Sequence, residues 1–157
     1  GLPGEGVGLV ARGFRWEEAG LRGEGTFQSG VDAFSGASRV AENIMRIQTL
    51  PADQKLALKN GGELELFWIG VGSAASKKSG QSNFLIIKGD AHLLVDLGTL
   101  GPLALSQTAR LAPMDIGNIL PTHSHADHIG GMEEMFLAWR YGSVKNGGPK
   151  PKCIITE

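Results

Sequence analysis

The sequence predicts an α/β fold in which strands and helices alternate along the chain. Residues 63–69 alternate apolar and polar side chains and are rich in strand formers. Two further apolar runs, 83–88 and 92–96, are separated by a short turn sequence, which is typical of a hairpin. Helical and strand patterns then follow one another to the end of the chain, which favours helices layered on a sheet.

The second half of the chain supplies that alternation. Residues 102–111 have helical spacing, and residues 116–120 form the short apolar run of a buried strand. Residues 130–141 carry apolar side chains at i, i+3, i+4 and i+7, so we expect a helix with one stripe packed in the core. A Gly/Pro/Lys-rich loop then leads to residues 152–156, a predicted final strand.

Composition excludes several classes of protein. A chain of 157 residues has the size of one domain or of half a larger one, and a hydrophobic content of 41% argues against disorder. Fifteen basic and 16 acidic residues give a net charge of −1, which provides no bulk field for nucleic acid or an anionic membrane. No run of about eighteen apolar residues exists to span a bilayer. The single cysteine, Cys153, cannot form an internal disulfide, and we expect it to be buried in a cytoplasmic protein.

The chain divides into two regions at a stop signal near residues 60–62. Residues 1–62 form an N-terminal extension whose first thirty residues are rich in glycine, so we expect them to be flexible or loosely folded. Residues 38–50 and 52–59 have helical patterns within it. Met45 is a plausible translation start, which would place residues 1–44 outside the native protein; the alternative is an irregular extension. Residues 63–157 form the second region.

Three of the four histidines and one aspartate lie within six residues of one another: His123, His125, Asp127 and His128. Imidazole nitrogen and carboxylate oxygen are ligands that zinc, manganese and iron(II) accept. In a looped backbone, the first two histidines would chelate one ion, and the aspartate with the last histidine would chelate a second. The alternative is a solvated polar turn, or one adventitious metal site.

A dinuclear site has a default chemistry. Two metals about 3.5 to 4 Å apart share a hydroxide whose pKa is pulled toward neutrality, which gives a nucleophile at physiological pH. The sequence therefore predicts a hydrolase that holds two Zn²⁺, with Mn²⁺ or Fe²⁺ as alternatives. Asp127 is the expected catalytic residue.

The histidine-rich run, together with the 82–86 and 93–98 segments upstream, resembles the metallo-β-lactamase-fold hydrolases. The resemblance implies a four-layer αβ/βα sandwich of two similar halves. This chain would be the first half, a mixed sheet with helices on one face and the other face uncovered. It also implies that His123 and His125 bind the first metal and that Asp127 and His128 bind the second, while Asp96 orients ligands or the motif loop.

The family completes both sites with later residues, and neither histidine nor aspartate follows His128 here. The resemblance therefore implies that a C-terminal half is needed and that the fragment alone has little activity. Within the family, the tRNase Z-like and cyclic-nucleotide phosphodiesterase branch is favoured, with a small-molecule or nucleotide phosphodiester as substrate. Thioesterases or lactonases, an iron-dependent redox protein and a non-catalytic fragment, which could pair as a homodimer, are the alternatives.

Two lysines near the predicted hairpin, Lys77 and Lys78, could touch a phosphate or could be ordinary solvated surface. We expect His92, the remaining histidine, to be structural.

Overall fold

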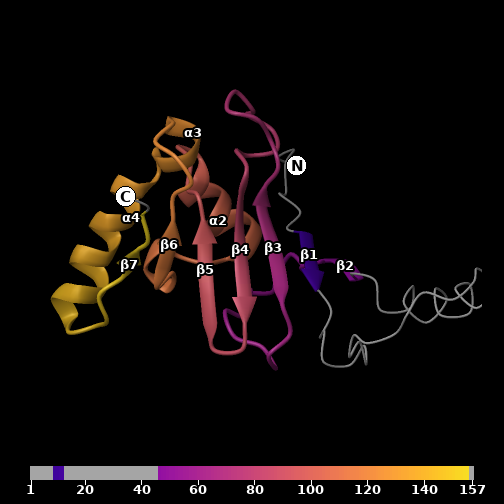
Figure 1. Ribbon diagram of the computed structural model, residues 1–157, viewed down its shortest axis with the longest axis horizontal. Coiled ribbons are helices and arrows are strands. Elements are labelled where there is room, and N and C mark those ends of the chain that lie inside the picture. The colour runs from indigo at the N-terminus through magenta and orange to yellow at the C-terminus, as the bar shows by residue number, and fades with distance from the viewer. Residues whose placement is uncertain (1–8, 13–45, 156–157) are drawn as a thin grey trace, which may run out of the picture.

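The computed structural model describes residues 9–12 and 46–155, and Figure 1 shows them as one mixed sheet with helices beside it. Seven strands are described, in the order β2-β1-β3-β4-β5-β6-β7. Their bounds are β1 Leu9–Arg12, β2 Arg46–Thr49, β3 Glu65–Gly70, β4 Asn83–Lys88, β5 Ala91–Val95, β6 Asn118–Leu120 and β7 Lys152–Cys153. Pairing is antiparallel from β2 to β5 and parallel from β5 to β7.

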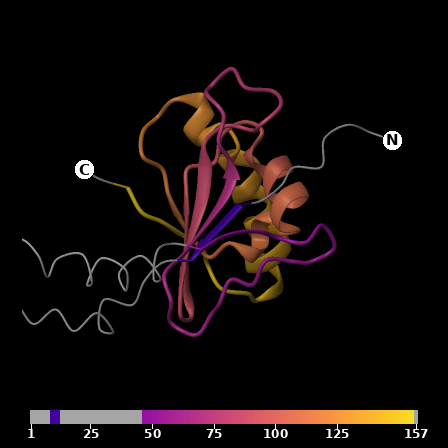
Figure 2. The same cartoon turned by 90° about the vertical axis from the view of Figure 1, so that its right-hand side faces the viewer.

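The two longer helices, α2 Gly101–Ala109 and α4 Met132–Ala138, lie on one side of the sheet, as the side view in Figure 2 shows. The short helix α3, Ala126–Ile129, lies beyond the end of the strands, and α4 continues into a π-helical turn, Trp139–Ser143. Pro102 occupies the first turn of α2, where its missing N–H is no loss, and Arg110 ends the helix in a left-handed conformation at φ 53°. The predicted α/β class, with a mixed sheet and few helices, is confirmed.

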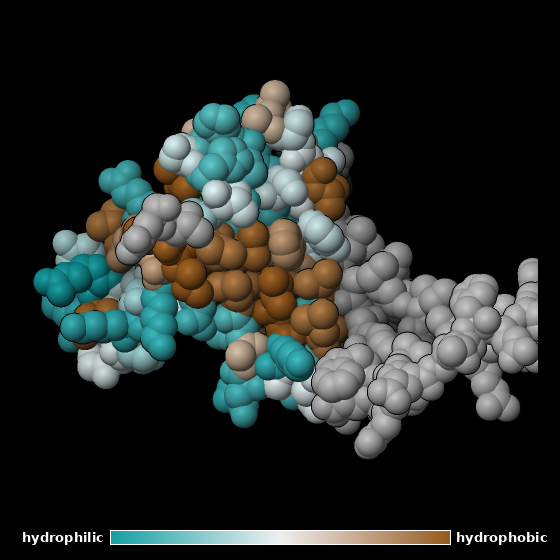
Figure 3. All heavy atoms as spheres, in the orientation of Figure 1, coloured by the Kyte–Doolittle hydropathy of each residue, from teal (hydrophilic) through white to brown (hydrophobic). Residues whose placement is uncertain are grey.

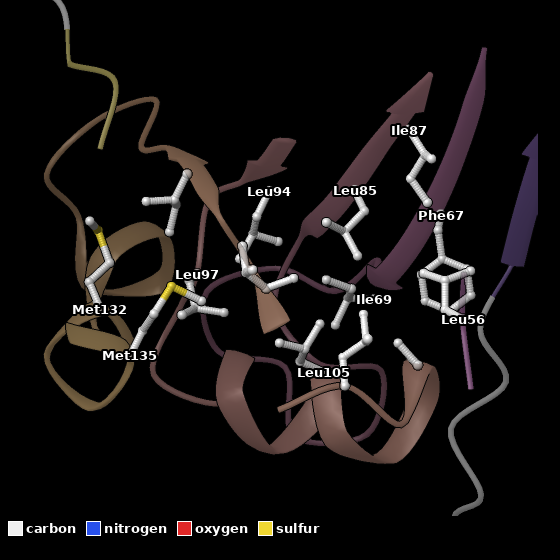
Figure 4. Packing of buried hydrophobic residues seen from close by; sticks show 14 of the residues in the cluster. Leu56, Phe67, Ile69, Leu85, Ile87, Leu94, Leu97, Leu105, Met132 and Met135 are labelled. Carbon is white, nitrogen blue, oxygen red and sulfur yellow. The ribbon is translucent and has the colours of Figure 1, made fainter. Parts of the chain in front are cut away.

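Alternation along the central strands directs one set of side chains toward the helices. Phe67, Leu85, Leu94 and Ile119 are fully buried on that face. Figure 4 shows Phe67, Leu85 and Leu94 on the side of the sheet that faces Leu105 of α2. The same hydrophobic cluster includes Ile119 and the two methionines of α4. In the stripe predicted for residues 130–141, Met132, Met135 and Trp139 pack in the core as expected, whereas Phe136 is 41% exposed, so its predicted burial is wrong.

The opposite face of the sheet is apolar and is not covered by the described helices. Its side chains follow the register across three strands: Leu66 pairs with Ile86, which pairs with Leu93, and Trp68 pairs with Phe84. The rings of Trp68 and Phe84 are in contact, with centroids 4.7 Å apart. Figure 3 shows this surface as a continuous hydrophobic area over the central strands. We call these five residues the open sheet face.

Three predictions for the N-terminal region are wrong where the structure describes it. The helix predicted over residues 38–50 is replaced at its end by β2, and the helix predicted over 52–59 is a turn followed by irregular chain. Leu9–Arg12, placed in a loosely folded stretch, forms a strand. β1 and β2 pair with each other, and β1 also pairs with β3, so distant pairing overrides the local pattern. Residues 38–45 lie outside the described part.

No helix in the described ranges has the length and apolar character needed to cross a membrane.

Candidate functional site

The predicted ligands lie beyond the carboxyl ends of two neighbouring parallel strands. β5 ends at Val95 and is followed by Asp96, while β6 ends at Leu120 and is followed by the loop that carries the histidines. Because β5 and β6 run in parallel, these two ends meet at one edge of the sheet. The topology therefore brings Asp96 to the motif from 26 or more positions away in sequence.

Asp96 holds the motif through both of its carboxylate oxygens. Oδ1 accepts hydrogen bonds from the backbone N–H and the hydroxyl of Thr122, at 2.7 and 3.0 Å. Oδ2 lies 2.7 Å from Nδ1 of His128. Asp96 adopts a left-handed backbone at φ 59°, a conformation that aspartate tolerates better than most residues do. Asp96 thus orients the motif, as expected, through Nδ1 of His128, and Nε2 of that ring is the nitrogen near Asp127.

The four motif side chains form two contacting pairs. Nε2 of His123 lies 3.1 Å from Nδ1 of His125, and Nε2 of His128 lies 3.2 Å from Oδ2 of Asp127. The rings of His123 and His128 are also in contact, with centroids 3.9 Å apart and planes tilted by 46°. The hydroxyl of Thr122 lies 3.0 Å from Nδ1 of His123, which leaves Nε2 as the nitrogen that meets His125.

Although the rings of His123 and His128 are in contact, the two pairs do not combine into one metal-binding group. Within residues 9–12 and 46–155, no three or more His, Cys, Asp or Glu side chains are arranged so that they could hold a metal ion. Each pair alone has suitable spacing, because two ligands about 2.0–2.1 Å from a tetrahedral zinc lie roughly 3.3 Å from each other. Each pair therefore offers two ligands, and a closed site would require further groups.

The motif loop is seated on the turn that follows Asp96. The backbone N–H of Leu97 donates to the carbonyl of His128 at 2.7 Å, and the N–H of Gly131 donates to the carbonyl of Leu97 at 2.9 Å. A Cβ on Gly98 would overlap the carbonyl oxygen of Asp127. The cluster is thus fixed by backbone contacts as well as by side chains.

Lys77, Lys78 and Cys153, to which the sequence analysis also assigned possible roles, lie outside the histidine cluster. Lys77 and Lys78 are exposed in the loop between β3 and β4. Cys153 is exposed on β7, so its predicted burial is wrong; β7 is a two-residue strand at the edge of the described sheet. Atoms packed against its thiol raise the pKa of Cys153, which disfavours the thiolate.

His92 has a structural position at the start of β5, at the far end of that strand from Asp96. Its Nε2 accepts a hydrogen bond from the N–H of Gly117 at 2.9 Å. Burial, and secondarily the positive charge of Lys59, lower the pKa of His92 below the usual 6.5. The imidazole is therefore held in its neutral form.

Sequence reasoning gave no role to Thr122, although its hydroxyl contacts Asp96, His123 and His128. A hydroxyl residue directly before the first histidine was the available signal, but its partners become apparent only when β5 and β6 lie side by side.

Comparison with known proteins identifies the family. A model of the family described as "Anti-Pycsar protein Apyc1" matches residues 64–157, which is more than half of the chain. The chain belongs to the Anti-Pycsar protein Apyc1 family. The match includes β3 to β7, with Asp96 and the whole histidine motif.

Similar proteins of this family occur in bacteria and phages. An Anti-Pycsar protein Apyc1 from Paenibacillus sp. (strain J14) is 40% identical over 94 residues, which cover 60% of this chain and 36% of the relative. The protein of the same name from Saccharibacillus brassicae is 39% identical over 94 residues, covering 60% and 37%. The one from Bacillus phage 010DV004 is 40% identical over 94 residues, covering 59% and 35%. The chain matches about a third of each relative's length.

This match corrects the family that the motif had indicated. The metallo-β-lactamase-fold hydrolases were expected, and the matching family is Anti-Pycsar protein Apyc1. The predicted zinc phosphodiesterase, and with it the broader class of metal-dependent hydrolases, is corrected as well, because the relatives are named for an action against Pycsar. No metal site is formed by the described residues, so the zinc hydrolase prediction is withdrawn.

Proposed function

We propose that this chain is part of a protein that acts against Pycsar in the cytoplasm, and that its histidine cluster is the binding site used for that action. The observation that carries the proposal is the match of residues 64–157 to a family bearing that name, within which the cluster lies. Relatives encoded by Bacillus phages support it, because a phage gains from a protein directed against a host system.

The donor set fits divalent cations. His123 with His125, and Asp127 with His128, would each supply two nitrogen or oxygen ligands at a spacing that suits one ion. Asp96 and Thr122 hold the Nδ1 atoms of His128 and His123, which is the usual arrangement behind a liganding histidine. A bound cation would supply positive charge that attracts the oxygens of a phosphate group.

We further propose a nucleotide with a phosphodiester group as the ligand. A cation at the cluster would attract the phosphate, and the exposed Lys77 and Lys78 would add positive charge in the loop between β3 and β4. The cluster side chains are partly accessible, since His128 and Asp127 keep 20% and 22% of their side-chain surface exposed. A ligand can therefore reach them from solvent.

The open sheet face supports a larger assembly. We propose that residues outside this chain cover it as the second half of a four-layer sandwich, and that these residues complete both metal pairs. The support is the apolar character of the face and the share of the relatives that the chain matches, about a third of their length. A homodimer through the same face is the alternative that association measurements would reveal.

The proposal is tested by plaque counts and metal titration on the same variants. Cells that carry Pycsar, with and without the complete protein that contains this chain, are infected with a phage that Pycsar restricts, and we expect that protein to raise the plaque count. His125→Ala should abolish the gain and weaken binding of Zn²⁺, Mn²⁺ or Fe²⁺ at least tenfold.

Lys77→Ala is the matched control for metal binding, because Lys77 carries no metal-binding donor at neutral pH and lies outside the cluster. Its metal affinity should equal that of the unchanged chain. If the complete protein gives no gain in plaques, or if its His125→Ala variant binds each metal as well as the unchanged protein does, the proposed function is wrong.

A further inference from the structure

Two amide side chains are buried close to the cluster without touching it. Asn83, the first residue of β4, is fully buried, and Gln81 keeps 6% of its surface exposed. Burying an amide costs free energy unless its polar atoms find hydrogen-bond partners. An apolar residue at position 83 would extend the neighbouring core at lower cost, so the amides must serve contacts that an apolar side chain cannot make.

Both amides hold the turn that follows Asp96. Oδ1 of Asn83 accepts the N–H of Gly98 at 2.9 Å, and Oε1 of Gln81 accepts the N–H of Leu100 at 3.1 Å. Nδ2 of Asn83 donates to the backbone carbonyl of Gln81, which links the side chain of Asn83 to the main chain that carries Gln81. The turn is thereby fixed at two backbone positions, Gly98 and Leu100, by residues at and just before the start of β4.

The same turn seats the cluster. Leu97 bonds to the backbone of His128, and the hydroxyl of Thr99 donates to the carbonyl of Ala126 at 3.3 Å. Between them, Gly98 packs so closely on Asp127 that a methyl group has no space. A displacement of the turn must therefore displace the residues that carry Asp127 and His128.

Gln81 also reaches the lysine loop, residues 71–80. Its Nε2 donates to the carbonyl of Ala74 at 3.2 Å, and its backbone forms a bridge with Gly72. One side chain thus contacts the loop that bears Lys77 and Lys78 and the turn that supports the histidine motif.

We propose that Gln81 and Asn83 are positioning residues that set the place of the histidine cluster and of the lysine loop relative to it. This inference rests on the proposed function for its purpose, but the positioning itself can be measured without a metal. Neither amide touches a ligand; each acts through the turn at residues 97–100.

The test uses Gln81→Met, which keeps the length of the side chain and removes both of its hydrogen bonds. In the metal-free chain, we expect the imidazole resonances of His123 and His128 to shift and the amide hydrogens of Leu97 and Gly131 to exchange about tenfold faster. Gln81→Glu retains an oxygen that can accept from Leu100, so it should restore the resonances in part. With metal, Gln81→Met should bind roughly tenfold more weakly.

Thr108→Val is the matched control, because it removes one hydrogen bond, from Thr108 to the carbonyl of Ala104, near the other end of α2. It should lower overall stability without moving the imidazole signals. If Gln81→Met leaves the imidazole resonances and the two exchange rates unchanged, or if Thr108→Val alters them equally, the positioning role is wrong. Failure of the unchanged chain to bind metal would overturn the proposed function, whereas the metal-free measurements would still decide the positioning role.

Discussion

At the scale of single residues, Asp96 shows how one carboxylate serves backbone and side chains together. It accepts from the Thr122 backbone and hydroxyl and also meets the ring of His128. Its side chain is only 8% exposed, so these contacts act with little screening by water. The orientation of the two histidines that flank the cluster depends on this residue and on Thr122.

His92 gives a pH-dependent contribution to stability. Because its pKa is lowered in the folded chain, the unfolded chain binds more protons below the usual pKa of 6.5. The contribution of neutral His92 is therefore fully present above that value and is lost as pH falls from it through the lower folded pKa. His92→Gln should give a smaller decrease in the free energy of unfolding between about pH 7 and pH 5, measured by urea titration.

Subtracting the decrease in the free energy of unfolding of His92→Gln from that of the unchanged chain leaves the contribution of His92, because the other titrating groups are the same in both. An equal decrease in both proteins would show that protonation of His92 is not linked to unfolding.

At the scale of elements, the contact between the turn at residues 97–100 and α3 determines where the motif lies. Gly98 is the closest point of that contact, because a Cβ there would overlap both Asp127 and Gln81. Gly131 is similarly close to the carbonyl of Gly98. Glycine is required here by the distance between two backbones.

Gly98→Ala should therefore destabilise the chain by about 1–3 kcal/mol through overpacking. Gly61→Ala is the matched control, since its Cβ would meet nothing within 4 Å, and it should change stability by no more than about 0.5 kcal/mol. Urea unfolding of both variants checks the difference, and equal stability of the two would contradict the close packing at Gly98.

Elements with strong local patterns could be predicted, and those that depend on distant pairing could not. The β4–β5 hairpin and α4 follow their periodicity, whereas β1 and β2 are four-residue strands that exist because they pair with each other. The site shows the same division. The motif is contiguous, so its spacing identified it, but Gln81 and Asn83 act on residues 15 or more positions away, which periodicity does not encode. The family could be identified neither from local patterns nor from the contacts in the structure, and it required comparison with relatives.

At the scale of the whole molecule, the sheet has two unlike faces. The helix side is a closed core, while the open sheet face presents the ring pair Trp68–Phe84 and neighbouring aliphatic side chains. A contiguous apolar surface of this kind marks an interaction surface. It should bind a hydrophobic dye as long as nothing covers it.

Ile86→Lys should reduce dye binding while changing the free energy of unfolding by about 1 kcal/mol or less, because Ile86 faces outward and is only half-buried. Leu85→Lys, one residue away on the fully buried side, should unfold the chain, because it places an unpaired charge in the core. Dye fluorescence and urea unfolding distinguish them. If Ile86→Lys were as damaging as Leu85→Lys, the face would already be packed within this chain.

The order of strands also sets a folding sequence. β4 and β5 are joined by a tight turn, so they can pair early, whereas β5 meets β6 only after residues 96–117, including α2, have crossed over. Non-local parallel pairing is slow because the chain loses the conformational entropy of a long loop before the stabilising contacts between the strands can form. The histidines follow β6, which pairs late, whereas Asp96 follows β5, which pairs early. We therefore expect the histidines to meet Asp96 only after β4 and β5 have paired.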